Sequence, residues 1–392
     1  MPESGGKVIP SARIRSIIKI IRSPGLPRGF FFKDGSDCPV VLRPLGLLTG
    51  IAANEAVAAG RARWLAGGPI AFMTAELFLD GADGVHVVTA PIGEIESWSA
   101  AEGDAVASAV AAALSGVSPP RPPFCGLFLD RPVIMGVVNV TPDSFHDGGL
   151  FVDPGAAIAQ GEALLEAGAD ILDIGGESTR PGAEPISDDE ELARIIPVIE
   201  PLARLQATIS VDTRRASVME VALARGARIV NDVTALADPG AVEIVAKAGA
   251  SVVLMHMQGE PGTMQQAPQY DHAPYEVCSY LAGRIRACED AGITRDRIAI
   301  DPGIGFGKTD AHNTQIMASL AILQGLGCAV VVGASRKSLI GRMAGIADTA
   351  DRLPGTIALT TLAAGQGAQI HRVHDVAEVR QALAIVDAVT RA

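Results

Sequence analysis

The sequence predicts a (β/α)8 TIM barrel that follows an N-terminal accessory α/β domain. Three observations support this fold class. The composition is 48% hydrophobic but only 4% aromatic, as expected where small aliphatic side chains fill buried parallel strands and their covering helices. A proline-dense stretch, SPPRPP, interrupts the chain at residues 118–123, and eight short apolar runs follow it. The length of 392 residues is sufficient for two domains.

The segment before the proline-rich stretch, residues 1–117, is expected to form the accessory domain. Candidate strands span 40–42, 70–78 and 85–88, and candidate helices span 54–59 and 101–114. This Ala- and Gly-rich segment contains no constellation of reactive side chains, so its role is not predicted. Residues 11–22 (SARIRSIIKIIR) are basic and somewhat amphipathic. They are expected to form a terminal helix or a loosely held tail, and contact with a membrane surface or an acidic partner is the alternative.

Residues 118–125 are expected to be a linker, because dense proline disfavours both helices and central strands. The barrel is then expected to cover 126–392. Its apolar runs alternate with helical segments, which indicates a parallel sheet, and eight repeats in about 265 residues match the usual ~250 residues of such a barrel. An open doubly wound sheet is the alternative. The runs are 133–140, 171–174, 208–211, 229–231, 251–255, 298–300, 329–332 and 369–373.

Local signals mark the ends of the intervening helices. Asp153 followed by Pro154 is typical of a helix start. Ser187 with Glu190 three residues later predicts a capping box. Glycines stand where four helices should stop: Gly168, Gly226, Gly249 and Gly292.

Composition argues against several classes of protein. A formal net charge of -12 disfavours binding to nucleic acid. The five cysteines are odd in number and widely spaced, unlike a disulfide framework or a zinc site. No apolar run reaches the ~18 residues of a membrane span, and the start lacks the apolar core of a signal peptide. We therefore expect a cytoplasmic protein with reduced thiols and no membrane or nucleic-acid partner.

Polar side chains follow nearly every predicted strand. In a β/α barrel the catalytic residues lie at the C-terminal ends of the strands, so these groups are expected to converge on one mouth. The stretches in question are NVTPDSF (139–145), GGESTRPG (175–182), DT (212–213), ND (231–232), MH (255–256), DPGIGFGK (301–308), GASRKS (333–338) and HRVHD (371–375).

The alternation of side chains along the last strand separates its two histidines. Arg372 and His374 share one face and His371 points to the other, so the HxxH spacing is not expected to bind a metal. Arg372 and His374 instead suggest a site for a phosphate-type anion. Arg180, in a loop flanked by Pro and Gly, is a candidate anion clamp, the alternative being an ordinary surface arginine.

Buried carboxylates at strand ends need partners. Asp212 and Asp301 could accept hydrogen bonds from a 2-amino-4-oxo heterocycle, which Asn231 could also bind through its mixed donor and acceptor groups. Lys337 could donate to the ring carbonyl. Alternatively, Asp212 and Asp301 pair with Lys337 or nearby arginines in a purely structural network.

The stretch GIGFGKT (303–309) is similar to a phosphate-binding P-loop, but its spacing is wrong. That motif requires a glycine where this chain has Pro302. Proline also lacks the backbone N–H that cradles phosphate. A P-loop is therefore not predicted.

Taken together, the strand ends resemble the dihydropteroate synthase family of pterin-binding barrels over about residues 126–390. The motifs, in order, are MGVVNVTPDSF, DIGGESTRPGA, VDT, NDV, LMHMQG, DPGIGFGK, GASRKS and RVHDV. The resemblance implies a Mg²⁺-dependent transferase of folate biosynthesis. It would displace diphosphate from (7,8-dihydropterin-6-yl)methyl diphosphate with the amine of 4-aminobenzoate. Sulfonamides would act as aminobenzoate mimics, and the barrel would form a homodimer.

The resemblance also implies a role for each matching residue. The pterin would contact Asp212, Asn231, Met255, Asp301, Phe306, Gly333 and Lys337. The diphosphate would contact Asn139, Arg180, Arg372 and His374, with Asn139 also linked to the magnesium ion. The aminobenzoate would contact Thr179, Arg180, Pro181 and Ser335. The catalytic residues would be Asp212, Lys337 and Asp147, the last closing over the reaction.

Two residues depart from the family pattern: His146 replaces the usual serine, and Arg215 replaces a common lysine. Neither has one of the roles given above, although His146 could alter the closure of the first loop. One alternative is a pterin-dependent methyltransferase of the corrinoid or methionine synthase type, which would not need the STRPG and SRKS loops or the anion site. The other is a non-catalytic pterin-binding homologue, which is expected to have lost those residues.

Overall fold

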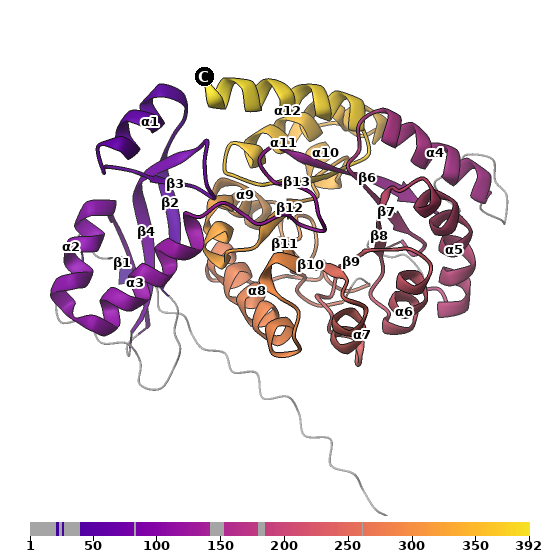
Figure 1. The fold of residues 1–392 in the computed structure, drawn as a ribbon, viewed down its shortest axis with the longest axis horizontal. Coiled ribbons are helices and arrows are strands. Elements are labelled where there is room, and N and C mark those ends of the chain that lie inside the picture. Colours follow the sequence, from indigo (N-terminus) through magenta and orange to yellow (C-terminus); the bar gives the residue numbers. More distant parts are fainter. Residues whose placement is uncertain are drawn as a thin grey trace, which may run out of the picture.

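A computed structural model describes residues 21–22, 26, 40–81, 84–141, 153–178, 185–260 and 262–392. Its larger part is a closed barrel of parallel strands in the order β10-β11-β12-β13-β6-β7-β8-β9, surrounded by helices (Figure 1). The predicted (β/α)8 barrel is confirmed, and the open sheet is wrong. The strands are β6 (Val133–Asn139), β7 (Ile171–Gly175), β8 (Thr208–Asp212), β9 (Ile229–Asp232), β10 (Ser251–Met255), β11 (Ile298–Asp301), β12 (Ala329–Val332) and β13 (Ile370–Val373).

Helices connect these strands and begin at the predicted caps. Asp153 accepts a hydrogen bond from the Gly155 amide and precedes Pro154. The Ser187 hydroxyl accepts from the Glu190 amide at 3.2 Å, whereas the Glu190 carboxylate accepts from Arg194 one turn later. The helices are α4 (Pro154–Glu166), α5 (Asp188–Arg204), α6 (Ala216–Ala224), α7 (Ala241–Ala248), α8 (Ala273–Asp290), α9 (Asp310–Ala318), α10 (Ser338–Ala344), α11 (Leu353–Ala364) and α12 (Val376–Arg391), with short 3-10 turns η2 (Arg295–Arg297), η3 (Leu320–Leu326) and η4 (Ala350–Arg352).

The barrel interior changes from apolar to polar along the strands. Near the strand starts, Met135, Ile171, Ile229 and Val253 form one buried cluster with Phe124, which is 1% exposed. Phe124 belongs to the predicted linker. The linker therefore also covers the end of the barrel at which the strands begin. The inward positions nearer the strand ends are polar and form the mouth described below.

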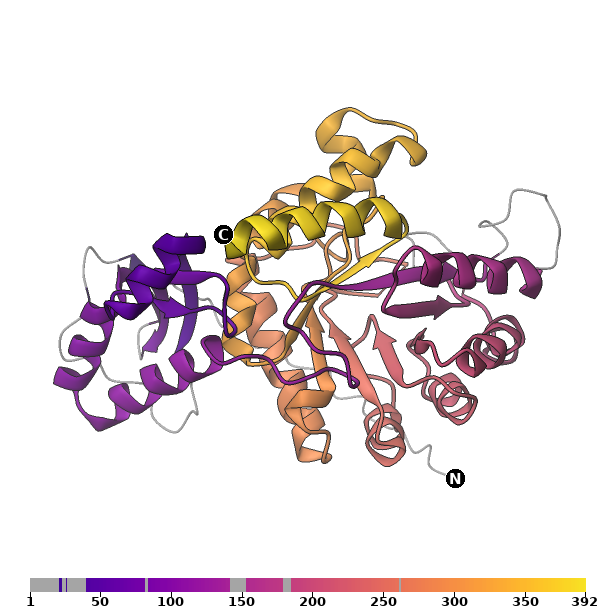
Figure 2. The same ribbon diagram turned by 45° about the horizontal axis from the view of Figure 1, so that its top comes forward.

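The N-terminal part is a separate sheet of order β1-β5-β4-β2, with β3 paired to β4. It lies beside the barrel on the side of α8 and α9 (Figures 1 and 2). Its elements are β1 (Ile21–Arg22), β2 (Val41–Leu48), α1 (Gly50–Ala58), β3 (Arg63–Trp64), β4 (Ala71–Gly81), β5 (Gly84–Pro91), α2 (Ile92–Glu102) and α3 (Asp104–Val117).

Two predictions for this part were wrong in detail. The helix expected over 101–114 is two helices, α2 and α3, because Gly103 between them has φ 108, a conformation that only glycine adopts easily. Residues 11–22 were expected to form a terminal helix or a loosely held tail, but the last two of them pair as a strand with β5. Residues 11–20 lie outside the described part of the chain.

Within the described ranges, no helix has the length and apolar character needed to cross a bilayer. Four of the five cysteines are free thiols in the structure, and Cys38 lies outside the described residues. The bounds given above for the accessory domain, the linker and the barrel stay a prediction.

Candidate functional site

Arg372, on β13, is the centre of the polar mouth. Its Nε donates to Asp173 Oδ2 at 2.6 Å, and its Nη2 donates to Asp212 Oδ2 at 2.7 Å. Asn231 Nδ2 donates to the same Asp173 oxygen at 3.0 Å. Four strands, β7, β8, β9 and β13, are therefore tied together by side chains that point into the barrel.

Asp173 was missed by sequence reasoning, although it opens the quoted motif DIGGESTRPGA. Its side chain is 0% exposed, and it lies opposite Ser210 in the register of β7 and β8. The sequence signal that could have identified it is a carboxylate inside an otherwise apolar five-residue strand. Asp173 is two positions before Gly175, so the two residues lie on the same face of the strand. Such a buried charge requires paired partners, which Arg372 and Asn231 supply.

A second group of residues lies on the neighbouring strand ends. Asp301, 6% exposed, accepts from the Gly303 amide at 2.6 Å. Lys337 Nζ donates to the Ile304 carbonyl and lies 4.3 Å from the centroid of the Phe306 ring. The Lys337 ammonium is thus held over an aromatic face, a favourable cation–π geometry.

Gly333 separates the two groups. A Cβ placed on it would lie 3.6 Å from both Asp301 Oδ2 and Arg372 Cδ. Met255 is 5% exposed and pairs with Asp301 in the strand register. The predicted pterin residues therefore lie at one mouth, as expected, while their contacts with a pterin remain predictions.

Ser335 and His374 meet at the edge of this mouth. Ser335 Oγ lies 3.0 Å from His374 Nδ1 and accepts from the His374 amide at 3.2 Å. Arg336, between Ser335 and Lys337, has φ 55 and pairs with Asp375. The left-handed conformation of Arg336 turns the backbone at this point. Its ion pair with Asp375 holds the Arg336 side chain away from Ser335 and Lys337.

Burial is the largest influence on the pKa values of the ionisable side chains at the mouth. It raises the pKa of Asp212 to about 7, with Arg372 acting in the opposite direction and Asp173 adding to the rise. Burial likewise raises the pKa of Asp301 and lowers that of Lys337 to about 8. Burial also opposes the charge on Arg372, but Asp173 and Asp212 raise its pKa above the usual value. Asp212 and Lys337 consequently titrate near neutrality, as is typical of functional sites.

The remaining site predictions fall into two sets. Asn139 is half-buried at the end of β6, opposite Gly175. The other set lies outside the described residues: Asp147, Thr179, Arg180 and Pro181, together with His146.

His371 and Lys308, which the sequence set apart from the polar site, are both buried. His371 is 0% exposed on the face opposite Arg372, and burial lowers its pKa to about 4. Lys308, the apparent P-loop lysine, is 2% exposed. Its Nζ donates to the carbonyls of His256, Gly303 and Phe306 at 2.9 to 3.1 Å and lies 2.9 Å from His256 Nδ1. Through these hydrogen bonds Lys308 holds the 303–306 turn in place.

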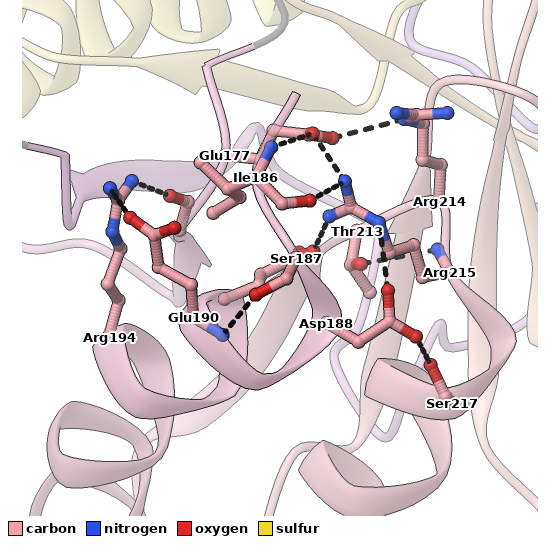
Figure 3. A network of polar contacts seen from close by, with 12 residues as sticks. Glu177, Ile186, Ser187, Asp188, Glu190, Arg194, Thr213, Arg214, Arg215 and Ser217 are labelled. Atoms are coloured by element: carbon pink, nitrogen blue, oxygen red, sulfur yellow. Dashed lines mark hydrogen bonds and ion pairs between the residues drawn. The ribbon is translucent and has the colours of Figure 1, made fainter. Parts of the chain in front are cut away.

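Arg215 organises a network of ion pairs beside the mouth (Figure 3). Its guanidinium contacts Glu177, Asp188 and the Ile186 carbonyl, as well as the buried Glu191. The Ile186 amide in turn donates to Glu177 at 3.4 Å. The fork of an arginine can bridge this many acceptors, which the single ammonium of a lysine cannot match in geometry.

Asn139 is the residue at the mouth that could hold a magnesium ion, and magnesium itself stays a prediction. Among the described residues no three His, Cys, Asp or Glu side chains gather as metal ligands. Mg²⁺ usually keeps several waters and binds through one or two protein oxygens plus substrate phosphates. The Asn139 amide oxygen can be such a ligand.

Comparison with known proteins agrees with this geometry. The family model described as "Pterin binding enzyme" matches residues 135–374, more than half of the chain. The dihydropteroate synthase of Escherichia coli K12 is 46% identical over 263 residues, which are 67% of this chain and 93% of that protein. This chain belongs to the dihydropteroate synthase family.

Other members of the family are equally similar. The enzyme of Neisseria meningitidis serogroup B is 49% identical over 66% of this chain and 93% of its own. A structure of the Xanthomonas albilineans synthase with 4-aminobenzoic acid superposes with a TM-score of 0.64 at 50% identity, covering 67% of this chain and 94% of that one. The Yersinia pestis synthase, in a sulfonamide complex, has a TM-score of 0.65 at 45% identity, covering 67% and 96%.

Proposed function

We propose that this protein condenses (7,8-dihydropterin-6-yl)methyl diphosphate with 4-aminobenzoate, giving 7,8-dihydropteroate and diphosphate. The observation that carries the proposal is the convergence of Asp212, Asn231, Asp301, Lys337 and Arg372 on one mouth in a member of this family. A dihydropteroate synthase from Xanthomonas albilineans, 48% identical, is known in complex with 7,8-dihydropteroate.

The pterin is proposed to bind in the slot beside Phe306 and Gly333. Asp301 would accept two N–H bonds from the amino-amide edge, with Asn231 further along the ring. Lys337, already oriented over Phe306, would donate to the ring carbonyl. Each donor and acceptor of the heterocycle would thereby have a partner, which such a site needs in order to reject analogues.

Departure of the diphosphate is proposed to begin the reaction. Arg372 uses Nε and Nη2 for its carboxylate partners, which among the described residues leaves Nη1 for a phosphate oxygen, with His374 beside it. Asn139 would hold Mg²⁺, and bound magnesium would neutralise charge on the leaving group. The C–O bond breaks with its electron pair going to the diphosphate, and Asp212, when ionised, stabilises the positive charge that develops on the pterin methylene.

The amine of 4-aminobenzoate then forms the new C–N bond and loses a proton to solvent. Ser335 is proposed to contact the aminobenzoate, together with Thr179, Arg180 and Pro181. Because an arylamine is a weak nucleophile, its positioning supplies most of the remaining acceleration. Asp147 is proposed to close over the site and exclude water.

The test is an assay for diphosphate release, run with and without 4-aminobenzoate and Mg²⁺, with the pteroate product identified by mass. Release that requires both supports the proposal. Asp301→Asn is expected to abolish it, whereas Asp296→Asn, an exposed carboxylate in η2, is expected to have no effect. Methyl transfer without diphosphate release would identify the methyltransferase alternative. Pterin binding without any turnover would identify the non-catalytic homologue.

A homodimer in the cytoplasm is proposed as the working form. Helices α11 and α12 expose large apolar side chains at Leu362, Ile385 and Val389, which are 59%, 63% and 67% exposed. Apolar side chains gathered on adjacent helices are typical of a subunit interface. Light scattering of the purified protein should give twice the 40.4 kDa chain mass, and Ile385→Glu should give the monomer mass.

A further inference from the structure

The accessory sheet packs its β4 strand against the start of barrel helix α8. The Phe78 ring stacks on Tyr275 with centroids 5.2 Å apart and planes at 20°, and it meets the His272 ring edge-on at 5.0 Å. Phe78 is 1% exposed and belongs to the core cluster of the barrel rather than to the core of the accessory sheet. The two parts of the chain therefore share one hydrophobic core at this point.

Close backbone contacts show that this packing is specific. A Cβ on Gly116 of α3 would lie 2.4 Å from the Gly325 carbonyl oxygen of η3, so only glycine permits this approach. Arg121 Nη2 donates to the Gln324 carbonyl at 2.6 Å, and Arg43 Nη2 donates to the Ala318 carbonyl at 3.2 Å. The accessory domain is therefore docked on the barrel through close backbone contacts and hydrogen bonds to backbone carbonyls.

The residues that Phe78 contacts form the N-terminal cap of α8. His272 is the N-cap, and its Nδ1 accepts from the Tyr275 amide at 3.2 Å. The His272 amide donates to Glu276 Oε1 at 2.7 Å. Phe78 thus packs on the side chains that define where α8 begins and at what angle the preceding loop enters it.

That loop, residues 256–272, extends from the end of β10 to the wall of the mouth. Among its described residues, Tyr270 Oη donates to the Gly307 carbonyl at 2.9 Å, and Gln265 Nε2 donates to the Gly305 carbonyl at 2.7 Å. A Cβ on Gly307 would lie 2.3 Å from the Gln258 carbonyl oxygen, so the two loops touch backbone to backbone. Phe306, whose ring lies under Lys337, stands between these two anchored glycines in the sequence.

We propose that Phe78 is a positioning residue for the pterin slot. The accessory domain packs on the N-terminal cap of α8 and so fixes the 256–272 loop, and this loop contacts the 305–307 turn that contains Phe306. We call this packing of Phe78 on the α8 cap the brace. The matched 263 residues make up 93% of the Escherichia coli relative, so that protein has little room for a counterpart of this brace. The inference rests on the proposed function, because the slot is assigned to the pterin there.

The test compares two phenylalanines of β4 in the full-length protein. Phe78→Leu removes the stacking on Tyr275 and is expected to raise the KM for the pterin diphosphate about three- to tenfold, which lies within the roughly two- to thirtyfold range of coupling through packed side chains. The kcat and the KM for 4-aminobenzoate are expected to stay within about twofold of wild type. Phe72→Leu is the matched control, since Phe72 is 0% exposed in the separate accessory core. It is expected to lower the melting temperature without changing either KM.

Hydrogen exchange supplies the second readout. In Phe78→Leu, amides of the 256–272 and 303–307 segments are expected to exchange faster, while those of β12 keep their rates. Should Phe78→Leu fail to fold, Phe78→Met provides the same comparison with a flexible side chain that can fill the space left by the ring. Equal KM changes in the Phe72 and Phe78 variants, or unchanged KM and exchange in a folded Phe78 variant, would overturn the inference. If wild type releases no diphosphate, the proposed function fails, and the brace is then tested by the same exchange comparison alone.

Discussion

The substitution Asp173→Asn tests whether the buried carboxylate on β7 organises the mouth. It keeps the shape of the side chain but removes its charge. Asp173 Oδ2 accepts from Arg372 Nε at 2.6 Å and from Asn231 Nδ2 at 3.0 Å, and the side chain is 0% exposed. Hydrogen bonds to a charged group contribute about 1.5–3 kcal/mol each, and an amide oxygen can still accept one of the two. We expect the free energy of unfolding to fall by about 2–3 kcal/mol, because Arg372 keeps Asp212 as its second partner.

The same change should shift the pH dependence of catalysis. The Asp173 charge is one of the causes that raise the pKa of Asp212 to about 7. Without that charge the pKa of Asp212 falls, so the carboxylate form persists to lower pH. If ionised Asp212 stabilises the cationic pterin, the acidic limb of kcat/KM against pH should move to lower pH in Asp173→Asn.

Urea denaturation at pH 7.5 and a pH–rate profile measure these two effects. Ser210→Ala is the matched control, since Ser210 is also 0% exposed and its hydroxyl has no hydrogen-bond partner among the described residues. This control is expected to change the unfolding free energy by less than about 1 kcal/mol and to leave the profile in place. A variant Asp173→Asn as stable as wild type, with an unmoved acidic limb, would refute the reasoning.

Three further predictions follow from the site. Arg372→Ala should weaken use of the diphosphate substrate while sparing the binding of free pterin, as measured by steady-state kinetics and calorimetry; equal loss of both would contradict the anion assignment. Lys308→Met should lower the unfolding free energy by about 2–4 kcal/mol, since it leaves buried carbonyls without a donor. A phosphate-binding lysine would instead show its largest effect on the KM. Sulfonamides should compete with 4-aminobenzoate, and a calorimetric titration showing both bound at once would rule out the Thr179–Pro181 subsite.

Much of the barrel was predictable because its signals are local. Each strand is a short apolar run, and caps such as Asp153 act over two or three residues, so neighbours in the sequence determine them. The convergence of Asp212, Asn231, Asp301 and Arg372 followed from one topological rule, that the C-terminal ends of parallel strands share an edge. The family motifs added the assignment of these groups to a pterin.

The tertiary structure alone decided the rest. The partner of Asp173 is Arg372, 199 residues away, and only closure of the barrel and its strand register bring β7 and β13 to the two sides of β6. The pKa values of Asp212 and Lys337 depend on burial, which no local pattern encodes. Phe78 reads in the sequence as an ordinary strand residue, yet it packs in the core of the barrel. Such long-range contacts depend on where distant segments meet, whereas helices and strands are specified mainly by the residues beside them.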